Sequence, residues 1–242
     1  VSQRRVGLFF FMPAHPSFNI TIQVSNYHYI KGGIKGSIEL GYAESLQSSR
    51  ETLLAFDLFL LGSLLIIALY HFGLYIFRRR DFPVLFFGVF CLLFATRSLL
   101  TGEIPLTVLF PDIDWMLMIR WELLNLYLSG MAGVLFYHSL YPVEFKRLIS
   151  RVLILISAAF CLAALFAPMG ILTETLMPYL LLMSVILVYI IGCLVLASMR
   201  GRDDAPLFLA GFAFIFISAL NDTLLSLDVL DTVQIIHFGY FL

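Results

Sequence analysis

Ionisable and amide side chains inside long apolar segments are the part of this sequence most able to carry a function. A charge within a bilayer-spanning helix is costly, so it usually faces protein or water and often marks a functional site. Carboxylates, guanidinium groups and amides that share one level of a helix bundle can form ion pairs, bind a polar ligand or exchange partners between two conformations. The residues of this kind are Asp57, Arg97, Arg120, Glu122, Asn125, Asn221 and Asp222.

The sequence contains none of the common patterns for catalysis or metal binding. It has no HExxH, no GxSxG and no phosphate-binding glycine loop, and its histidines and three cysteines are scattered singly. Its lysines, which could carry a retinal Schiff base, all lie outside the middle of an apolar segment: Lys31, Lys35 and Lys146. We therefore expect no catalytic residue, metal or cofactor in this chain.

The composition is that of a polytopic membrane protein. Hydrophobic residues make up 61% of the 242 residues, charged residues 13%, and the mean hydropathy is +0.96. A soluble domain is about half apolar and about a quarter charged. The net charge is −1 and no block of basic residues suggests a nucleic-acid partner, so we expect none. The partner expected first is the lipid bilayer.

Seven apolar segments predict an all-α membrane fold, a bundle of seven transmembrane helices. They lie at 53–77, 82–100, 115–141, 148–166, 176–199, 206–224 and 233 to the end. The third is the segment around which the others are organised, because it combines charges, small residues and a tyrosine-rich end. The seventh is cut short at Leu242 and the chain starts at Val1, so we expect a piece of a longer protein.

The first 48 residues differ from the rest and alternate like strands. Ile20, Ile22 and Val24 are separated by polar residues, and Lys31-Gly32-Gly33 signals a turn. A few strands cannot bury a core alone, so these are expected to be the last strands of a larger β domain. The predicted division is 1–48 for this β domain and 49–242 for the membrane region, with a polar joint at 47–51.

The distribution of basic residues predicts the orientation, because cytoplasmic loops are rich in Lys and Arg. Alternate loops carry Arg78, Arg79, Arg80, Lys146, Arg147, Arg151, Arg200 and Arg202. The opposite loops, 102–114, 167–175 and 225–232, have no Lys or Arg. The β domain is therefore expected outside, and the seventh helix is expected to lead into the cytoplasm.

With this orientation, the polar residues listed at the outset fall at one level near the outer surface. Two interpretations remain open for this outer polar belt. It can be an outward-facing pocket that binds a ligand or couples to the β domain, or a set of ion pairs that holds the bundle together. Arg97 and Glu122 are the pair expected to touch. The small residues Ser129, Gly130 and Gly133 allow close helix packing, within the bundle or in a homodimer.

Several stretches resemble one family. They are IQVSNYHYIKGGIKGSIELG at 22–41, ATRSLLTGEIP, DWMLMIRWELLNLYLSGMAGVLFYHSLYPVEF and ALNDTLLSLDVLDTVQIIHFGYF. Together they are similar to bacterial seven-transmembrane receptors with diverse intracellular signalling modules, from about residue 4 to the end. Recurrent positions of that family match Arg97, Trp121-Glu122, the Tyr-Pro-x-Glu at 141–144 and Asn221-Asp222.

The resemblance implies a sensory receptor of the bacterial inner membrane. Its external part would be a jelly-roll β domain related to carbohydrate-binding modules, and its ligand a carbohydrate or another small molecule. A cytoplasmic effector domain in the same chain would be a histidine kinase of a two-component system, a diguanylate cyclase (GGDEF) or a similar module. The alternative is a transporter or channel with an outward-facing polar site, tested by flux in proteoliposomes.

The expected Arg97–Glu122 pair can be tested by exchanging the two charges. Arg97→Glu and Glu122→Arg should each impair folding and signalling, because each leaves two like charges together in an apolar layer. The double exchange should restore both. Membrane yield and thermal unfolding measure the first, and output of the full-length protein the second. A double variant no better than the single ones contradicts the pairing.

Overall fold

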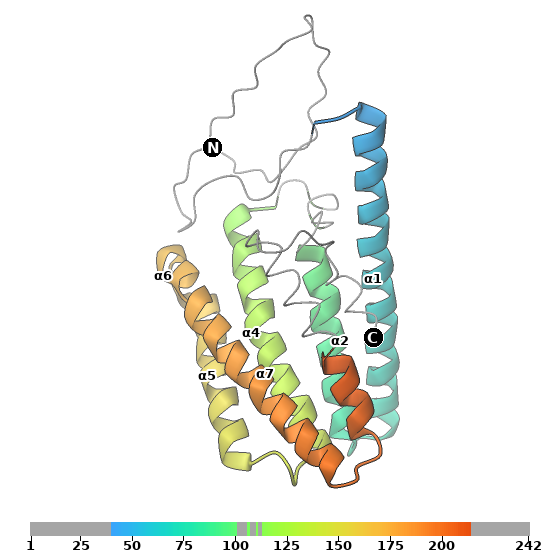
Figure 1. Ribbon diagram of the computed structural model, residues 1–242. Coiled ribbons are helices and arrows are strands. Elements are labelled where there is room, and N and C mark those ends of the chain that lie inside the picture. Colours follow the sequence, from blue (N-terminus) through green and yellow to red (C-terminus); the bar gives the residue numbers. More distant parts are fainter. Residues whose placement is uncertain (1–39, 101–105, 107–109, 111–112, 214–242) are drawn as a thin grey trace, which may run out of the picture.

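The computed structural model describes residues 40–100, 106, 110 and 113–213, and this part of the chain is a bundle of helices (Figure 1). The helices are α1 (Ala43–Phe77), α2 (Phe82–Leu100), α4 (Trp115–Leu140), α5 (Arg147–Phe166), α6 (Met169–Glu174) and α7 (Leu176–Met199). One more helix begins at residue 205 and runs to 213, where the described residues end; we call it the 205–213 helix. Within these residues, five spans are long and apolar enough to cross a membrane, with α6 and α7 counted as one.

The long helices run alternately up and down, so that successive turns lie at opposite ends of the bundle (Figure 1). The α1–α2, α4–α5 and α7–205 turns lie at one end, which we call the inner end. All eight basic residues used above to predict the orientation lie in these turns or in the first two turns of α5. The start of α4 and the turns at α6 lie at the other, outer end. The all-helical fold and the alternation of segments are confirmed for the described residues.

Helix α4 is the centre of the bundle. It packs against α2, α5 and α7, whereas α1 packs mainly on α2. Half of the residues in its most apolar window are buried, against 17–28% in the other four candidate spans. A helix that touches three others must bury side chains around most of its circumference. The third segment is therefore central in space, as its composition suggested.

Helix boundaries follow the caps and prolines of the sequence. Asp114 is the N-cap of α4, and its Oδ1 accepts a hydrogen bond from the Met116 N–H at 3.1 Å. Pro83 and Pro178 lie in the first turns of α2 and α7, where a missing N–H costs nothing. Pro168 precedes α6 as its N-cap residue.

The structure differs from the expected elements at two places. Helix α1 begins at Ala43, so the polar joint expected at 47–51 is helical, with Gln47 Nε2 donating to Glu51 Oε1 at 2.8 Å. The outer loop expected at 167–175 contains the short helix α6. The expected β strands and seventh segment, and the sixth segment beyond 213, lie outside the described residues. The seven-helix count and the division at residue 48 therefore stay predictions.

The outer surface of the bundle is apolar, as a lipid environment requires. Large exposed side chains run along the helices: Ile66, Leu69 and Ile76 on α1, Leu155 and Leu162 on α5, and Leu181, Val185 and Val188 on α7. A continuous apolar face of this size would not remain solvated in a water-soluble monomer. These faces are therefore the surface that contacts lipid.

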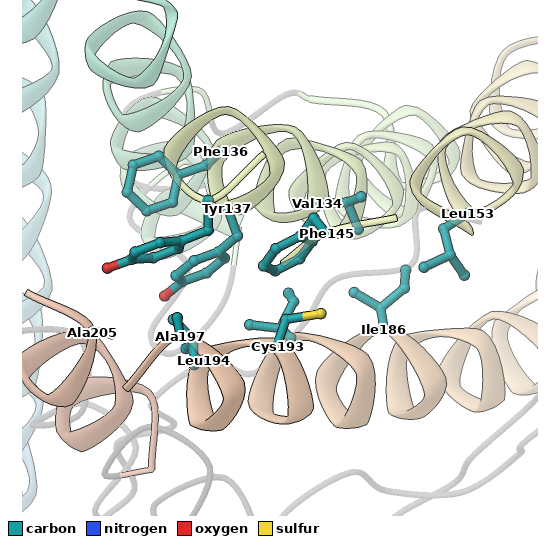
Figure 2. Packing of buried hydrophobic residues seen from close by; sticks show 12 residues of the cluster. Val134, Phe136, Tyr137, Phe145, Leu153, Ile186, Cys193, Leu194, Ala197 and Ala205 are labelled. Carbon is teal, nitrogen blue, oxygen red and sulfur yellow. The ribbon is translucent and has the colours of Figure 1, made fainter. Parts of the chain in front are cut away.

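Two buried clusters lie where α4 and α7 meet, and both include residues of α5. The inner one includes Val134, Tyr137, Phe145, Ile186 and Leu194, with the Phe145 ring from the α4–α5 turn inserted between the two helices (Figure 2). Full burial of such side chains contributes about 1.5–3 kcal/mol each relative to water. In lipid, where the alternative environment is also apolar, close packing contributes in its place. The outer cluster is centred on two fully buried tyrosines, described below.

Gly130 is required where α4 approaches α7. A methyl group at this position would overlap the Tyr179 hydroxyl and come within 3.2 Å of Met183 Cε. At Gly133, one turn further on, the nearest atom would be Phe90 Cε2 at 3.8 Å, an ordinary contact. Both glycines therefore face neighbours within the same chain. Of the two uses expected for the small residues, the described structure shows intramolecular packing.

Gly130→Ala should destabilise the bundle by about 1–3 kcal/mol, because the fully buried Tyr179 ring has no free space to move into. Gly133→Ala is the matched control: we expect no loss, and a gain of up to about 1 kcal/mol from helix propensity. Thermal unfolding in detergent or nanodiscs measures both variants. Equal midpoints for the two would contradict the close approach at Gly130.

Candidate functional site

Five of the seven residues predicted for the outer polar belt lie in described helices. Asp57 is in α1, Arg97 in the last turn of α2, and Arg120, Glu122 and Asn125 in the outer half of α4. Asn221 and Asp222 lie outside the described residues. The structure shows hydrogen-bond partners for two of the five, Arg120 and Asn125.

Arg120 caps the C-terminal end of α5. Its Nη1 donates to the carbonyl oxygens of Ala164 at 2.6 Å and Leu165 at 3.1 Å, and its Nη2 donates to that of Ala167 at 2.9 Å. The last carbonyls of a helix have no partner within the helix, and they carry the negative end of its dipole. A planar guanidinium group can satisfy several of them at once. Arg120 therefore fastens α4 to the outer end of α5.

Asn125 joins α4 to α2. Its Nδ2 donates to the Leu93 carbonyl at 2.9 Å and to Thr96 Oγ1 at 2.6 Å. Thr96 in turn donates to carbonyls within its own helix, so its oxygen is free to accept. The other amide atom, Asn125 Oδ1, is buried and has no hydrogen-bond partner among the described residues. Buried polar atoms of this kind are uncommon and mark a place where a ligand or water would gain a bond.

The carboxylates of the belt differ in exposure. Asp57 is buried in the bundle, with 6% of its surface exposed, while its neighbours Leu58 and Phe59 face outward. Glu122 is half-buried and Trp121 beside it is exposed, in the direction of lipid. Asp57 is turned inward although the two residues that follow it face outward, as expected for a charge in a membrane helix. The predicted Arg97–Glu122 contact stays a prediction.

A second polar group lies beside the belt and was not expected from the sequence. The Tyr127 and Thr175 hydroxyls are 2.6 Å apart, and the Tyr179 hydroxyl donates to the Tyr127 carbonyl at 2.9 Å. Both tyrosines are fully buried, with ring centroids 4.4 Å apart. Aromatic residues in an apolar run carry no sign of which ones face each other. Gly130 is the one sequence feature that points to this contact, because the missing side chain leaves room for the Tyr179 hydroxyl.

A buried carboxylate forms the main polar feature of the inner end. Glu144 lies in the α4–α5 turn, and its side chain is 1% exposed. Its Oε1 is 3.4 Å from Arg200 Nη1 and 3.8 Å from Arg202 Nε, two arginines whose side chains are 49% and 51% exposed. Its Oε2 is buried and has no partner among the described residues. We call Tyr141, Glu144, Arg200 and Arg202 the inner cluster.

The backbone around Gly201 places both arginines at Glu144. Gly201 has φ of 75°, a left-handed conformation that glycine adopts without strain. The Gly201 N–H donates to the Ser198 carbonyl at 3.0 Å and the Arg202 N–H to that of Ala197 at 3.2 Å, which is a Schellman motif. The chain reverses at Gly201, so residues on both sides of it reach one carboxylate.

The contacts of Arg200 and Arg202 with Glu144 are weak, although the buried Glu144 carboxylate is costly to leave without partners. Distances of 3.4 and 3.8 Å are longer than a good charged hydrogen bond, about 2.7–2.9 Å. Each arginine is half-exposed, so water screens the attraction. An unsatisfied buried oxygen costs about 1–3 kcal/mol. The Tyr141 hydroxyl is also buried and unpartnered among the described residues, and burial followed by the nearby Asp204 carboxylate raises the pKa of Tyr141.

Aromatic rings join the same elements as the inner cluster. Tyr137 and Tyr141, at the end of α4, meet Phe208 edge to face with ring centroids 6.2 and 6.4 Å apart. Tyr137 also meets Phe212 at 5.9 Å, and stacks on Phe145 of the α4–α5 turn at 6.4 Å. The end of α4, the turn after it and the 205–213 helix therefore form one packed unit.

Among the described residues, the histidines make contacts within or between helices and the cysteines are buried in the bundle. His71 Nδ1 is 2.8 Å from the Ile67 carbonyl one turn earlier, and His138 Nδ1 is 3.1 Å from Ser150 Oγ, which links α4 to α5. The cysteines Cys91, Cys161 and Cys193 are all buried and free. Across the described ranges, no group of three or more His, Cys, Asp or Glu residues could hold a metal ion.

Fold, lipid-facing surface and polar contacts together define a multi-pass helical membrane protein. A family model for the membrane region of receptors described as "7TM diverse intracellular signalling" matches residues 53–242. This is most of the chain, so the protein belongs to that family, and the resemblance is confirmed for residues 53–242. The membrane domain of the family is a sensor and not a catalyst. No curated protein and no solved structure matches the chain.

Removing the guanidinium group of Arg120 should loosen the outer end of α5. We expect Arg120→Gln to lower the free energy of unfolding by about 1–3 kcal/mol, because three carbonyl contacts and a favourable dipole interaction are lost. Arg120→Lys should lower the free energy of unfolding by about half as much, because the positive charge remains but the several N–H donors of the planar guanidinium group are lost. Thermal unfolding measures both, with the exposed Arg79→Gln as control. An unfolding midpoint of Arg120→Gln equal to that of the control would contradict the capping role.

Proposed function

We propose that this protein relays a signal from outside the cytoplasmic membrane to an effector domain in the cytoplasm. Membership in a family of membrane sensors supports the sensory role. The single observation that carries the direction of signalling is the charge asymmetry of the bundle. All eight basic residues of the alternate turns lie at the inner end, and cytoplasmic ends of membrane proteins carry such excess.

The proposed orientation puts the N-terminus outside, in the inner membrane of a bacterium. The first 48 residues would then belong to an external β domain of jelly-roll type, and its ligand would be a carbohydrate or another small molecule. The effector domain would follow the seventh helix in the same chain. A histidine kinase or a diguanylate cyclase fits a family whose signalling modules are diverse. A homodimer would bring two such modules together.

Helix α1 would be the first link of the relay. It is one continuous helix from Ala43 to Phe77, so it extends about 15 Å before the apolar segment expected at residue 53. A rigid helix of this kind passes a rotation or a shift of the external domain into the bundle. There α1 packs on α2, and α2 packs on α4 through the Asn125 contact.

The relay would act by shifting a balance between two arrangements of the helices. A ligand can shift that balance only by the difference between its affinities for the two arrangements. The outer polar belt is suited to such a shift. It contains charged and amide groups that bridge helices, and a change of partners there changes how α2, α4 and α5 pack. Whether the belt also touches ligand is a separate part of the proposal.

The proposal is tested in the full-length protein, reconstituted in nanodiscs, with the activity of its effector domain as readout. Deleting residues 1–42 should change the output several-fold, because the external domain no longer biases the bundle. Ser48→Gly with Ser49→Gly should do the same, since two exposed glycines weaken α1 by about 1 kcal/mol relative to the serines and by about 2 kcal/mol relative to two alanines. Ser48→Ala with Ser49→Ala is the matched control and should leave the output unchanged.

Two results would contradict the proposal. The first is an output that neither the deletion nor the glycine pair alters. The second is solute flux into proteoliposomes above the lipid background that Glu122→Gln abolishes, which would favour the transporter or channel.

A further inference from the structure

The inner cluster joins two turns that are far apart in the chain. Glu144 belongs to the turn that follows α4, and Arg200 and Arg202 belong to the turn that follows α7. The Cys193 thiol of α7 also contacts the Glu144 carbonyl at 3.6 Å. Both turns lie at the inner end of the bundle, and close to them the buried Phe145 ring lies between α4 and α7 (Figure 2).

We infer that the contact of Glu144 with Arg200 and Arg202 is the coupling point at which movement of α4 passes to the helix that follows α7. This inference rests on the proposed function and assigns it a residue set. Helix α4 is held at its outer half by Arg120 and Asn125, and it ends at the Tyr141 cap, three residues before Glu144. A shift of α4 therefore moves the Glu144 carboxylate directly.

The other side of the contact leads toward the C-terminal part of the chain. Gly201 reverses the backbone, and the 205–213 helix begins three residues after Arg202. Ala205, at its start, is fully buried in the same cluster as Phe145 and Tyr141. A force on Arg200 and Arg202 is therefore applied at the first turn of that helix.

The energetics suit a contact that changes between two states. A carboxylate with two close guanidinium partners would hold one arrangement firmly. A solvent-exposed carboxylate would contribute little to holding the two turns together. Here one buried oxygen is shared between two arginines at long distances, and the other oxygen has no partner among the described residues. A small displacement can bring the second oxygen into contact or release the first, since salt-bridge strength falls steeply as its geometry worsens.

The basic residues of the inner end have a simpler role as well, which is to fix the orientation. That role explains arginines in exposed turns but not a buried carboxylate beneath two of them. It also does not distinguish Arg200 and Arg202 from Arg79 and Arg80 of the α1–α2 turn, for which the structure records no contact with Glu144. The two pairs therefore provide a matched comparison of equal charge.

The test compares Glu144→Gln, the double variant Arg200→Gln with Arg202→Gln, and the control Arg79→Gln with Arg80→Gln. All are made in the full-length protein in nanodiscs. The first readout is hydrogen–deuterium exchange at the Gly201 and Arg202 amides, which the Schellman motif protects. We expect about tenfold faster exchange in the first two variants and no change in the control, because the turn opens more often without its anchor.

The second readout is the output of the effector domain. Glu144→Gln and the Arg200/Arg202 double variant should shift the basal output by about fivefold and in the same direction, because each removes the same contact. Combining all three changes should add little to either, as expected for partners in one contact. The control pair should give wild-type output. Unchanged exchange at the turn, or unchanged output despite faster exchange, would overturn the inference.

These outcomes are distinct from a failure of the proposed function. If deleting residues 1–42 changes the output and Glu144→Gln does not, the relay stands and the inner contact is not its coupling point. If Glu144→Gln changes the output and the deletion does not, the inner contact controls the effector without a signal from outside.

Discussion

The need to satisfy every polar group inside an apolar bundle is the constraint on which this structure depends. In lipid, a backbone carbonyl without a partner costs several kcal/mol, and water is not available to replace it. The carbonyls of Ala164, Leu165 and Ala167 at the end of α5 find their partner in Arg120, one helix away. The charge of Arg120 finds its own compensation there. One interaction thus removes two costs, and it fixes the outer ends of α4 and α5 relative to each other.

The same constraint makes α4 the centre of the bundle. Its polar side chains bond to each neighbour in turn: Arg120 to α5, Asn125 to α2, and the Tyr127 carbonyl to Tyr179 of α7. Apolar packing alone would hold these helices with little preference for one rotation over another, since lipid competes for the same contacts. Directed hydrogen bonds select the rotation, and Gly130 leaves room for the Tyr179 hydroxyl and the Met183 side chain of α7.

The sequence was sufficient to predict most of the helices but only part of their contacts. Long apolar runs, prolines at helix starts and the Asp114 cap determine the bounds of α2, α4, α5 and α7 to within about one residue, because these signals are local, whereas the short helix α6 was expected to be a loop. The start of α1 was missed because a polar, amphiphilic helix such as 43–52 has no hydrophobic signal. Arg120 was found because a charge in an apolar run is conspicuous. Its partner could not be found, since three backbone carbonyls carry no mark in a sequence.

Glu144 is a residue whose burial could not be predicted from the sequence. In the sequence, the Tyr-Pro-x-Glu at 141–144 stands out only through its resemblance to the family, because an acidic residue in a turn rich in basic residues resembles a solvated one. Its burial follows from Phe145 and Tyr141 on either side, whose rings pack into α7 and the 205–213 helix and draw the turn inward. Once the turn is drawn in, the carboxylate needs a counter-charge. Gly201 supplies it by turning Arg200 and Arg202 toward the same point. The burial of Glu144 is thus a consequence of aromatic packing around it. The packing of Tyr141 and Phe145 is therefore linked, through Glu144, to the position of the turn after α7.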